Sequence, residues 1–252
     1  MTASRRFTGW DDQADWYDAH LGDEGDDLYR AVVLPLVLRQ LDLKPGMRVL
    51  DCACGQGVVA RMLARQGVKV TGVDASEALI AAARRRDCSG IDYRVGDARE
   101  LRAAIGKRRF ERACIVLALQ DIDELHTVAE QLALMLEPGG LLVAVLTHPC
   151  FRVPQHSDWL TDAQGRRGRW IDHYASEIEL AITTHPGMPD SAESRSWHRP
   201  LASYIDAFGA AGFGLIRCEE PMSPRRGEHP EEQRSAAEIP LFIGLTWQRL
   251  PA

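Results

Sequence analysis

Short apolar runs alternate with amphipathic segments between residues 48 and 147. The apolar runs have the length of buried strands, and they cover Arg48–Cys52, Lys69–Val73, Ile91–Val95, Ala113–Leu117 and Leu141–Leu146. The segments between them have helical character, and they cover Val58–Arg65, Ser76–Arg86 and Asp121–Leu136. Strands that alternate with helices imply parallel strands joined by right-handed crossovers. The pattern therefore predicts an α/β fold with a doubly wound, mostly parallel sheet and helices on both faces.

The region after the fifth apolar run loses this alternation. Residues 148–198 show little periodicity, but they hold three of the six tryptophans and five of the eight histidines. Such enrichment favours a cap that covers a ligand site. An insertion that only buries its own aromatic side chains is the alternative. If the segment is a cap, its aromatic walls are expected from Phe151, Trp159, Trp170 and Tyr174.

Regular patterns return at Pro200, where a helical stripe of apolar residues begins. Two further apolar runs follow at Phe213–Cys218 and Leu241–Trp247, and a polar loop over Pro224–Ala237 separates them. We expect these runs to close the sheet as an antiparallel pair.

The N-terminal region suits one or two helices laid against the core. Residues 10–42 have this character, and Pro35 is expected to break or kink the helices. The whole chain, residues 1–252, is therefore expected to form one domain with an N-terminal helical segment at 10–42 and a cap insertion at 148–198.

The composition narrows the range of partners. The 252 residues carry a formal net charge of −6, which disfavours a nucleic-acid partner because nucleic-acid binders present basic surfaces. The chain shows no uncharged stretch long enough to span a membrane, and its N-terminus lacks the apolar core of a signal peptide. The six cysteines are scattered, which favours a reducing cytoplasm. The sequence leaves the oligomeric state open.

One strand–turn–helix segment carries the features of a ligand site. Val49–Gly57 runs from a buried strand through an acid, Asp51, into a turn of small residues and then a helix start. Small side chains let the backbone approach a ligand closely, and free N–H groups at the helix start favour an anionic group. The glycine spacing does not match a dinucleotide fingerprint, because Ala60 stands at the third glycine position, and the segment lacks the Lys-Ser/Thr ending of a phosphate-binding loop.

This segment resembles motif I of the class I S-adenosylmethionine (SAM) dependent methyltransferases, with Ala53 in place of the first glycine. Further segments resemble the same family in the same order, namely Val70–Ser76, Tyr93–Ala98, Phe110–Asp121 and Leu136–Leu142. Glu111 stands where the family usually has Asp. The resemblance implies a seven-stranded sheet of order 3-2-1-4-5-7-6, SAM as the cofactor, and methyl transfer to a small-molecule acceptor.

The resemblance also implies roles for single residues. Asp74 ends the second strand and would bind the ribose hydroxyls, while Asp97 would take the adenine amino group next to the Ala98 N–H. The full set expected to bind the cofactor is Tyr17, Asp51, Ala53, Cys54, Gly55, Gly57, Asp74, Ala75, Asp97, Ala98, Val116 and Leu117.

Three residues are candidates for catalysis. His148 follows the fifth strand, and His173 with Tyr174 lies in the cap. A histidine near the acceptor could take its proton at neutral pH, although alignment of the reactants alone could also suffice. No metal site is expected, because no standard ligand spacing occurs. A nicotinamide-dependent oxidoreductase and a non-catalytic SAM-binding protein remain alternatives, and the atom that accepts the methyl group stays open.

Overall fold

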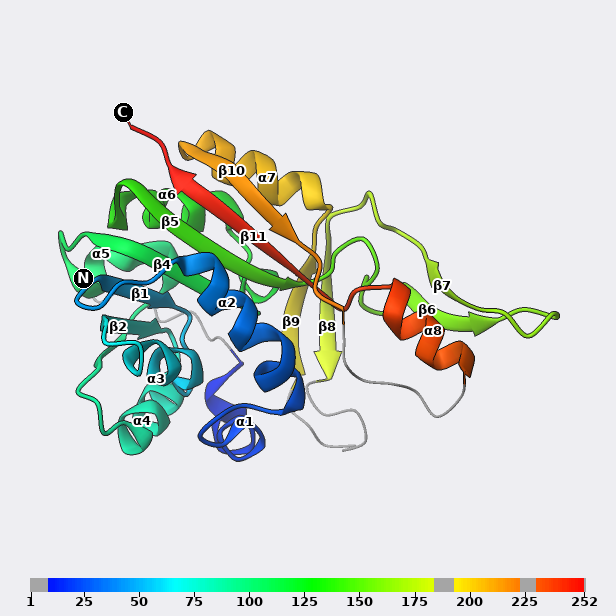
Figure 1. Cartoon of the computed structure of the whole chain (residues 1–252), viewed down its shortest axis with the longest axis horizontal. Helices are drawn as coiled ribbons and strands as arrows, with labels where there is room; N and C mark the ends of the chain where they lie inside the picture. The colour runs from blue at the N-terminus through cyan, green and yellow to red at the C-terminus, as the bar shows by residue number, and fades with distance from the viewer. Residues whose placement is uncertain (1–8, 184–192, 223–229, 252) are drawn as a thin grey trace.

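A seven-stranded sheet forms the centre of the protein in its computed structural model, which describes residues 9–183, 193–222 and 230–251 (Figure 1). The strand order is β10-β11-β5-β4-β1-β2-β3, which confirms the order expected from the resemblance. The strands are β1 (Arg48–Cys52), β2 (Lys69–Asp74), β3 (Asp92–Val95), β4 (Phe110–Val116), β5 (Leu136–Thr147), β10 (Phe213–Glu219) and β11 (Phe242–Arg249). The first five are mutually parallel, and β11 pairs antiparallel with both β5 and β10.

Helices cover both faces of this sheet. One face is covered by α2 (Leu34–Leu41), α3 (Val58–Ala64) and α4 (Glu77–Arg86), and the other by α5 (Leu101–Ile105), α6 (Leu125–Met135) and α7 (Leu201–Ala210). Each face contributes its own cluster of buried apolar side chains, in which Leu36 and Leu63 belong to the first and Leu132 and Trp247 to the second. This two-sided burial explains the nearly continuous apolar runs of the strands.

Two boundaries differ from the expectation. β5 already begins at Leu136, which pairs with Phe110 of β4, and the Pro–Gly–Gly stretch falls in the register shift before Leu141 pairs with Arg112. The helix expected from Asp121 begins only at Leu125, and Leu119–Asp121 forms a short 3-10 turn, η4. The turn displaces Asp121 from the helix toward the carboxyl end of β4.

The N-terminal segment contains η1 (Asp11–Gln13), α1 (Ala14–Leu21), a π-helical turn η2 (Tyr29–Val33) and α2. Pro35 lies within the continuous helical stretch 27–41, directly after η2, and the wider π-helical turn leaves room there for a residue without an N–H. The expected break at Pro35 is wrong, because η2 runs directly into α2, and the helix departs from α-helical geometry only in the π-helical turn before the proline. The segment packs against the apolar cluster of the α2–α3 face through Leu21 and Val33.

The cap region contains two hairpins. β6 (Ser157–Thr161) pairs with β7 (Arg167–Ile171), and β8 (Ile178–Thr183) pairs with β9 (Glu193–His198). The β6–β7 hairpin projects away from the sheet beside α8 (Pro230–Glu238), and Arg167 of β7 forms an ion pair with Glu232 of α8 (Figure 1). The expected polar loop over Pro224–Ala237 is therefore partly wrong, because its described end belongs to α8; residues 223–229 lie outside the described part.

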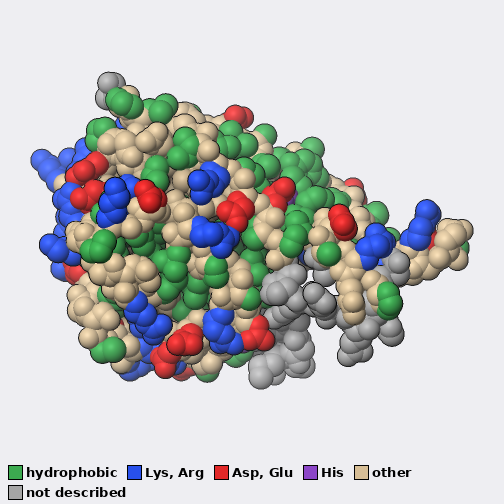
Figure 2. All heavy atoms as spheres, in the orientation of Figure 1, with side chains coloured by type: hydrophobic (Ala, Val, Ile, Leu, Met, Phe, Trp, Pro, Cys, Tyr) green, Lys and Arg blue, Asp and Glu red, His purple; other side chains and the backbone are tan. Residues whose placement is uncertain are grey.

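Acidic and basic side chains are interspersed over the face of the sheet domain shown in Figure 2, so its described part carries no large patch of one sign. No helix among the described residues has the length and apolar character that crossing a membrane requires.

Candidate active site

A cavity of about 770 Å³ opens at the carboxyl ends of β1, β2 and β4, where the strand order reverses direction. Open α/β sheets bind their ligands at this place. The strand ends and the turns that follow them form its floor, α1 contributes Tyr17, and the β8–β9 hairpin forms the opposite wall. The loop after β3 lines the cavity too, so residues that lie far apart in the sequence meet at one site.

The small-residue turn after β1 lines the floor through Ala53 and Gly55. Ala53 has a φ of 56°, a left-handed conformation that favours glycine, so the alanine at this position carries strain. Gly57 does not line the cavity but forms the N-cap of α3 with a φ of 82°. A Cβ at Gly57 would lie 2.3 Å from the Tyr93 hydroxyl, so only glycine fits there.

Asp51 and Cys54 lie beneath this turn and not in the cavity wall. Asp51 is buried, and its Oδ1 accepts a weak hydrogen bond from the Cys114 thiol at 3.4 Å. Burial raises the pKa of Asp51 to about 7. Its Oδ2 has no hydrogen-bond partner among the described residues. Cys54 is buried too, and burial raises the pKa of its thiol, so it is a packed side chain and not a reactive thiolate.

Asp74 lines the cavity at the end of β2 with both carboxylate oxygens already oriented. Its Oδ2 accepts a hydrogen bond from the Gly55 N–H at 2.8 Å, and its Oδ1 accepts one from the Ser76 N–H at 2.9 Å. Burial raises the pKa of this carboxyl, and the two backbone donors oppose that rise. Each oxygen retains a lone pair for a hydroxyl donor in the cavity.

Asp97 and Asp123 are joined by one arginine that sequence reasoning missed. Arg99 Nε and Nη2 donate to the two oxygens of Asp97 at 2.9 and 2.5 Å, and Arg99 Nη1 donates to Asp123 at 2.5 Å. All three residues line the cavity. The two carboxylates hold the pKa of Arg99 above its ordinary value. Asp97 is therefore a member of an ion-pair chain across the cavity.

The carboxyl end of β4 and the turn after it form the rest of the cavity floor. Val116, Leu117 and Ala118 line the cavity, and Leu117 has a φ of 52°, which is unusual for a bulky side chain. Asp121 of η4 lines the same end. Sequence reasoning placed Asp121 in a helix start and gave it no role. Its position one turn after a strand end was the signal that could have found it.

The β8–β9 hairpin forms a wall through Glu179, Ala181, Ser194, Arg195 and Trp197. Trp197 supplies the aromatic surface, whereas the expected Phe151, Trp159, Trp170 and Tyr174 do not line this cavity. Trp159 instead lies under the guanidinium groups of arginines near the β6–β7 hairpin. The alternation of Ile178, Leu180 and Ile182 in β8 was the strand signal within a segment that otherwise shows little periodicity.

Comparisons with known proteins agree with this geometry. Residues 49–140 match a family model described as a methyltransferase domain. A solved S-adenosylmethionine dependent methyltransferase from Mesorhizobium loti superposes with a TM-score of 0.70 and 26% identity, over 85% of this chain and 96% of that one. Residues 49–140 therefore carry a methyltransferase domain.

Two methyltransferases of known name are similar to this chain in sequence. A ubiquinone biosynthesis O-methyltransferase from Bradyrhizobium diazoefficiens is 38% identical over 112 residues, which are 42% of each chain. A demethylmenaquinone methyltransferase from Corynebacterium glutamicum is 34% identical over 116 residues, which are 46% of this chain and 48% of its own length. The chain therefore spans about half the length of these relatives.

The residues present fit SAM, the cofactor of this domain. The partly buried Asp74 carboxylate, which two backbone N–H groups hold in place, offers acceptors to a ribose diol. Tyr17 covers the turn from α1, since its ring lies 3.4 Å from the position of a Cβ on Gly55. Ala75 and Ala98 line the cavity with little bulk.

His148 lies outside the cavity wall. Its side chain is buried, its Nε2 lies 2.6 Å from Oε1 of Glu220, and its Nδ1 accepts a hydrogen bond from the Cys150 N–H at 3.2 Å. Burial lowers the pKa of His148, while Glu220 opposes that change. Both ring nitrogens are engaged by the protein, so the geometry gives His148 no direct route to an acceptor. Its role as a base stays a prediction from sequence.

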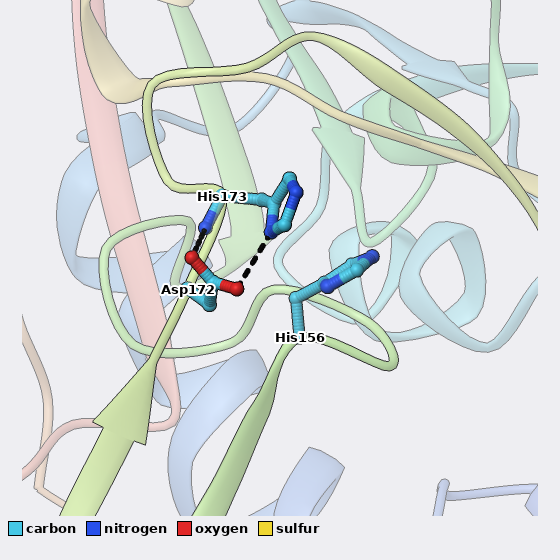
Figure 3. A group of neighbouring side chains, drawn as sticks. All are labelled: His156, Asp172 and His173. Atoms are coloured by element: carbon cyan, nitrogen blue, oxygen red, sulfur yellow. Dashed lines mark hydrogen bonds and ion pairs between the residues drawn. The ribbon is translucent and has the colours of Figure 1, made fainter.

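His173 and Tyr174 follow β7 and also lie outside the cavity wall. Figure 3 shows His173 beside Asp172 and His156, with Nδ1 of His173 2.9 Å from Asp172. The possible ligand atoms of these three side chains lie within 4.8 Å of one another, so they could hold a metal ion, although two of them are exposed. The Tyr174 hydroxyl accepts hydrogen bonds from the Leu201 N–H and the Cys150 thiol.

Proposed function

We propose that this protein is a SAM-dependent methyltransferase that acts on a small molecule held between the end of β4 and the β8–β9 hairpin. The observation that supports it is the single cavity in which the motif I turn, Asp74 and the hairpin wall meet. The domain match and the names of the relatives support the same activity. Neither an oxidoreductase nor a non-catalytic scaffold has such support here.

We assign the cofactor to the β1–β2–β3 side of the cavity. Asp74 would accept hydrogen bonds from the ribose hydroxyls, and Ala98 would offer its backbone beside the adenine. The backbone of Ala53 and Gly55 would contact the methionine part, with Tyr17 above it. The bound cofactor supplies an electrophilic methyl group on a sulfonium centre. The protein contributes by aligning the acceptor with that group and by excluding water.

The acceptor side is bounded by Leu117, Ile122, Ala181 and Trp197, a mostly apolar surface. Such a surface suits a flat, partly apolar molecule. Two relatives are named for ubiquinone and menaquinone metabolism, which supports an aromatic acceptor for this chain as well. The cavity is acidic, and we infer that neither nucleic acid nor a membrane surface is the partner. The six free cysteines support a reducing cytoplasm as the location.

Calorimetry tests the proposal through Asp74→Asn, which keeps the shape of the side chain and removes its charge. SAM should bind the wild type, and the variant should lose roughly 1.5–3 kcal/mol of binding free energy, since charge-assisted hydrogen bonds are lost. Asp206→Asn is the matched control, because Asp206 is an exposed aspartate on α7, away from the cavity. Tight binding of a nicotinamide dinucleotide in place of SAM would contradict the proposal.

A further inference from the structure

Asp121 is a carboxyl group in the cavity wall without a partner. It lies at the end of η4, directly after the strand end that carries Leu117. Among the residues that the structure describes, no hydrogen bond or ion pair reaches its side chain, whereas Asp74, Asp97 and Asp123 in the same cavity are all bonded. Burial raises the pKa of Asp121 to about 8, and no neighbouring cation offsets this effect.

A second unpartnered polar group belongs to the hairpin wall. Ser194 of β9 lines the cavity, is 2% exposed, and its Oγ has no hydrogen-bond partner among the described residues. β9 lies directly against η4, because the Ser196 hydroxyl donates to the Gln120 carbonyl at 3.3 Å. Residues two apart on a strand share a face, so Ser194 faces the same side as Ser196. A buried polar group without a partner is costly, so Ser194, in the same cavity wall as Asp121, indicates a polar ligand.

The charged groups around Asp121 leave it free to act on a ligand. Arg99 is held by Asp97 and Asp123, and Arg195 forms an ion pair with Glu179. Arg199 donates to the backbone carbonyls of Leu119, Ile122 and Asp123. The other titratable groups that face this region are Tyr17, Tyr29, Asp74 and Tyr204. The carboxylates outnumber the cations, so an anionic acceptor would be repelled.

We propose that Asp121 and Ser194 form the acceptor subsite for a neutral aromatic hydroxyl compound, and that Asp121 is the general base that removes its proton. Leu117 and Ile122 supply apolar surface for the ring, and Ser194 Oγ pairs with a polar substituent. This inference rests on the proposed function, because it needs the methyl donor on the other side of the cavity.

The reaction at this subsite balances without a further reactant. The acceptor oxygen forms a bond to the methyl carbon while the carbon–sulfur bond breaks, and the electron pair of that bond stays on sulfur. The hydroxyl proton moves to an Asp121 carboxylate oxygen and later to solvent. A base whose pKa lies near the working pH suits this task, because it is partly ionised and still basic enough to accept the proton.

The first experiment measures ligand selection without turnover. With the demethylated cofactor product S-adenosylhomocysteine saturating at pH 8.5, calorimetry compares 2-naphthol with 2-naphthoate, its carboxylate analogue. We expect the neutral phenol to bind the wild type about tenfold more tightly, since like charges in a partly buried site repel. Asp121→Asn should bring the two affinities close together, and Asp206→Asn should not. An unchanged preference in Asp121→Asn would overturn the subsite.

The second experiment measures methyl transfer from labelled SAM to 2-naphthol and 2-naphthylamine. Turnover of 2-naphthol should rise with pH up to a plateau above about 8, and Asp121→Asn should lower it by about a hundredfold while SAM affinity stays unchanged. Ser194→Ala should raise the KM more than it lowers kcat. Methylation of the amine but not of the phenol would overturn the hydroxyl assignment. Full turnover in Asp121→Asn would overturn the base, whereas failure of SAM binding to the wild type would contradict the methyltransferase function itself.

Discussion

The Asp74 carboxylate accepts a hydrogen bond from the Gly55 N–H at 2.8 Å, which ties the end of β2 to the turn after β1. The bond joins two groups of the protein itself, so it fixes the position of the turn expected to contact the methionine part relative to the acid expected to bind the ribose. A preformed site loses less conformational freedom on binding than a loop that must order.

The strained alanine in this turn gives a stability prediction. Ala53→Gly should raise the free energy of unfolding by up to about 1 kcal/mol, because relief of the left-handed strain at φ 56° outweighs the greater entropy of glycine in the unfolded chain. Denaturant unfolding measures the change. Ala81→Gly on the exposed side of α4 is the control and should lower stability by about 1 kcal/mol. A loss at both positions would show that the turn tolerates alanine without strain.

The contact between Gly57 and Tyr93 gives a second prediction. Gly57→Ala should lower the free energy of unfolding by about 1–3 kcal/mol, since its Cβ would overlap the Tyr93 hydroxyl and its φ of 82° disfavours alanine. Tyr93→Phe removes the nearest atom, so the double variant should recover part of the loss in thermal unfolding. If Gly57→Ala lost the same stability with and without Tyr93→Phe, the backbone conformation of residue 57 would be the only cause of the loss.

The carboxyl group of Asp121 predicts how stability depends on pH. Its pKa is about 8 in the folded state, against an ordinary value of 3.8 for an aspartate in the unfolded chain, so the folded state binds the extra proton between these values. Stability from this group is therefore greatest at low pH and falls as the pH rises toward 8, by at most about 1.4 kcal/mol per pH unit. Asp121→Asn should remove this part of the pH dependence, so the free energy of unfolding of the variant should fall less steeply with pH than that of the wild type. A parallel profile in both proteins would contradict the raised pKa.

Replacing His148 distinguishes a structural role of this histidine from a catalytic one. Its lowered pKa keeps the ring neutral in the fold, so stability from this group is present above about 6.5 and is lost as the pH falls below that value. We expect His148→Ala to cost about 1–3 kcal/mol of folding free energy, because it leaves the Cys150 N–H without its partner. Turnover per folded molecule should fall less than tenfold. A loss of about a hundredfold with an intact fold would support His148 as the base.

Much of the site could be expected from local sequence. The motif I turn and the acid at the end of β2 lie where a strand pattern meets small residues, and the structure brings Ala53, Gly55, Asp74 and Asp97 to one cavity. Their roles toward the cofactor stay predictions. The local pattern did not reveal the role of Arg99. A charged residue after a strand can have many roles, and the sequence does not show which residues it contacts.

The sequence by itself determined the alternation of strands and helices, the strand order through its resemblance to a known family, and the chemistry of the cofactor side. These features depend on neighbours along the chain, since each strand and the turn after it form one local unit. Only the tertiary structure decided the acceptor side. There β9 packs on η4 through Ser196 and Gln120, which lie 76 residues apart. The packing of these distant segments leaves the side chains of Asp121 and Ser194 without a hydrogen-bond partner among the described residues, and no periodicity in the chain encodes that proximity.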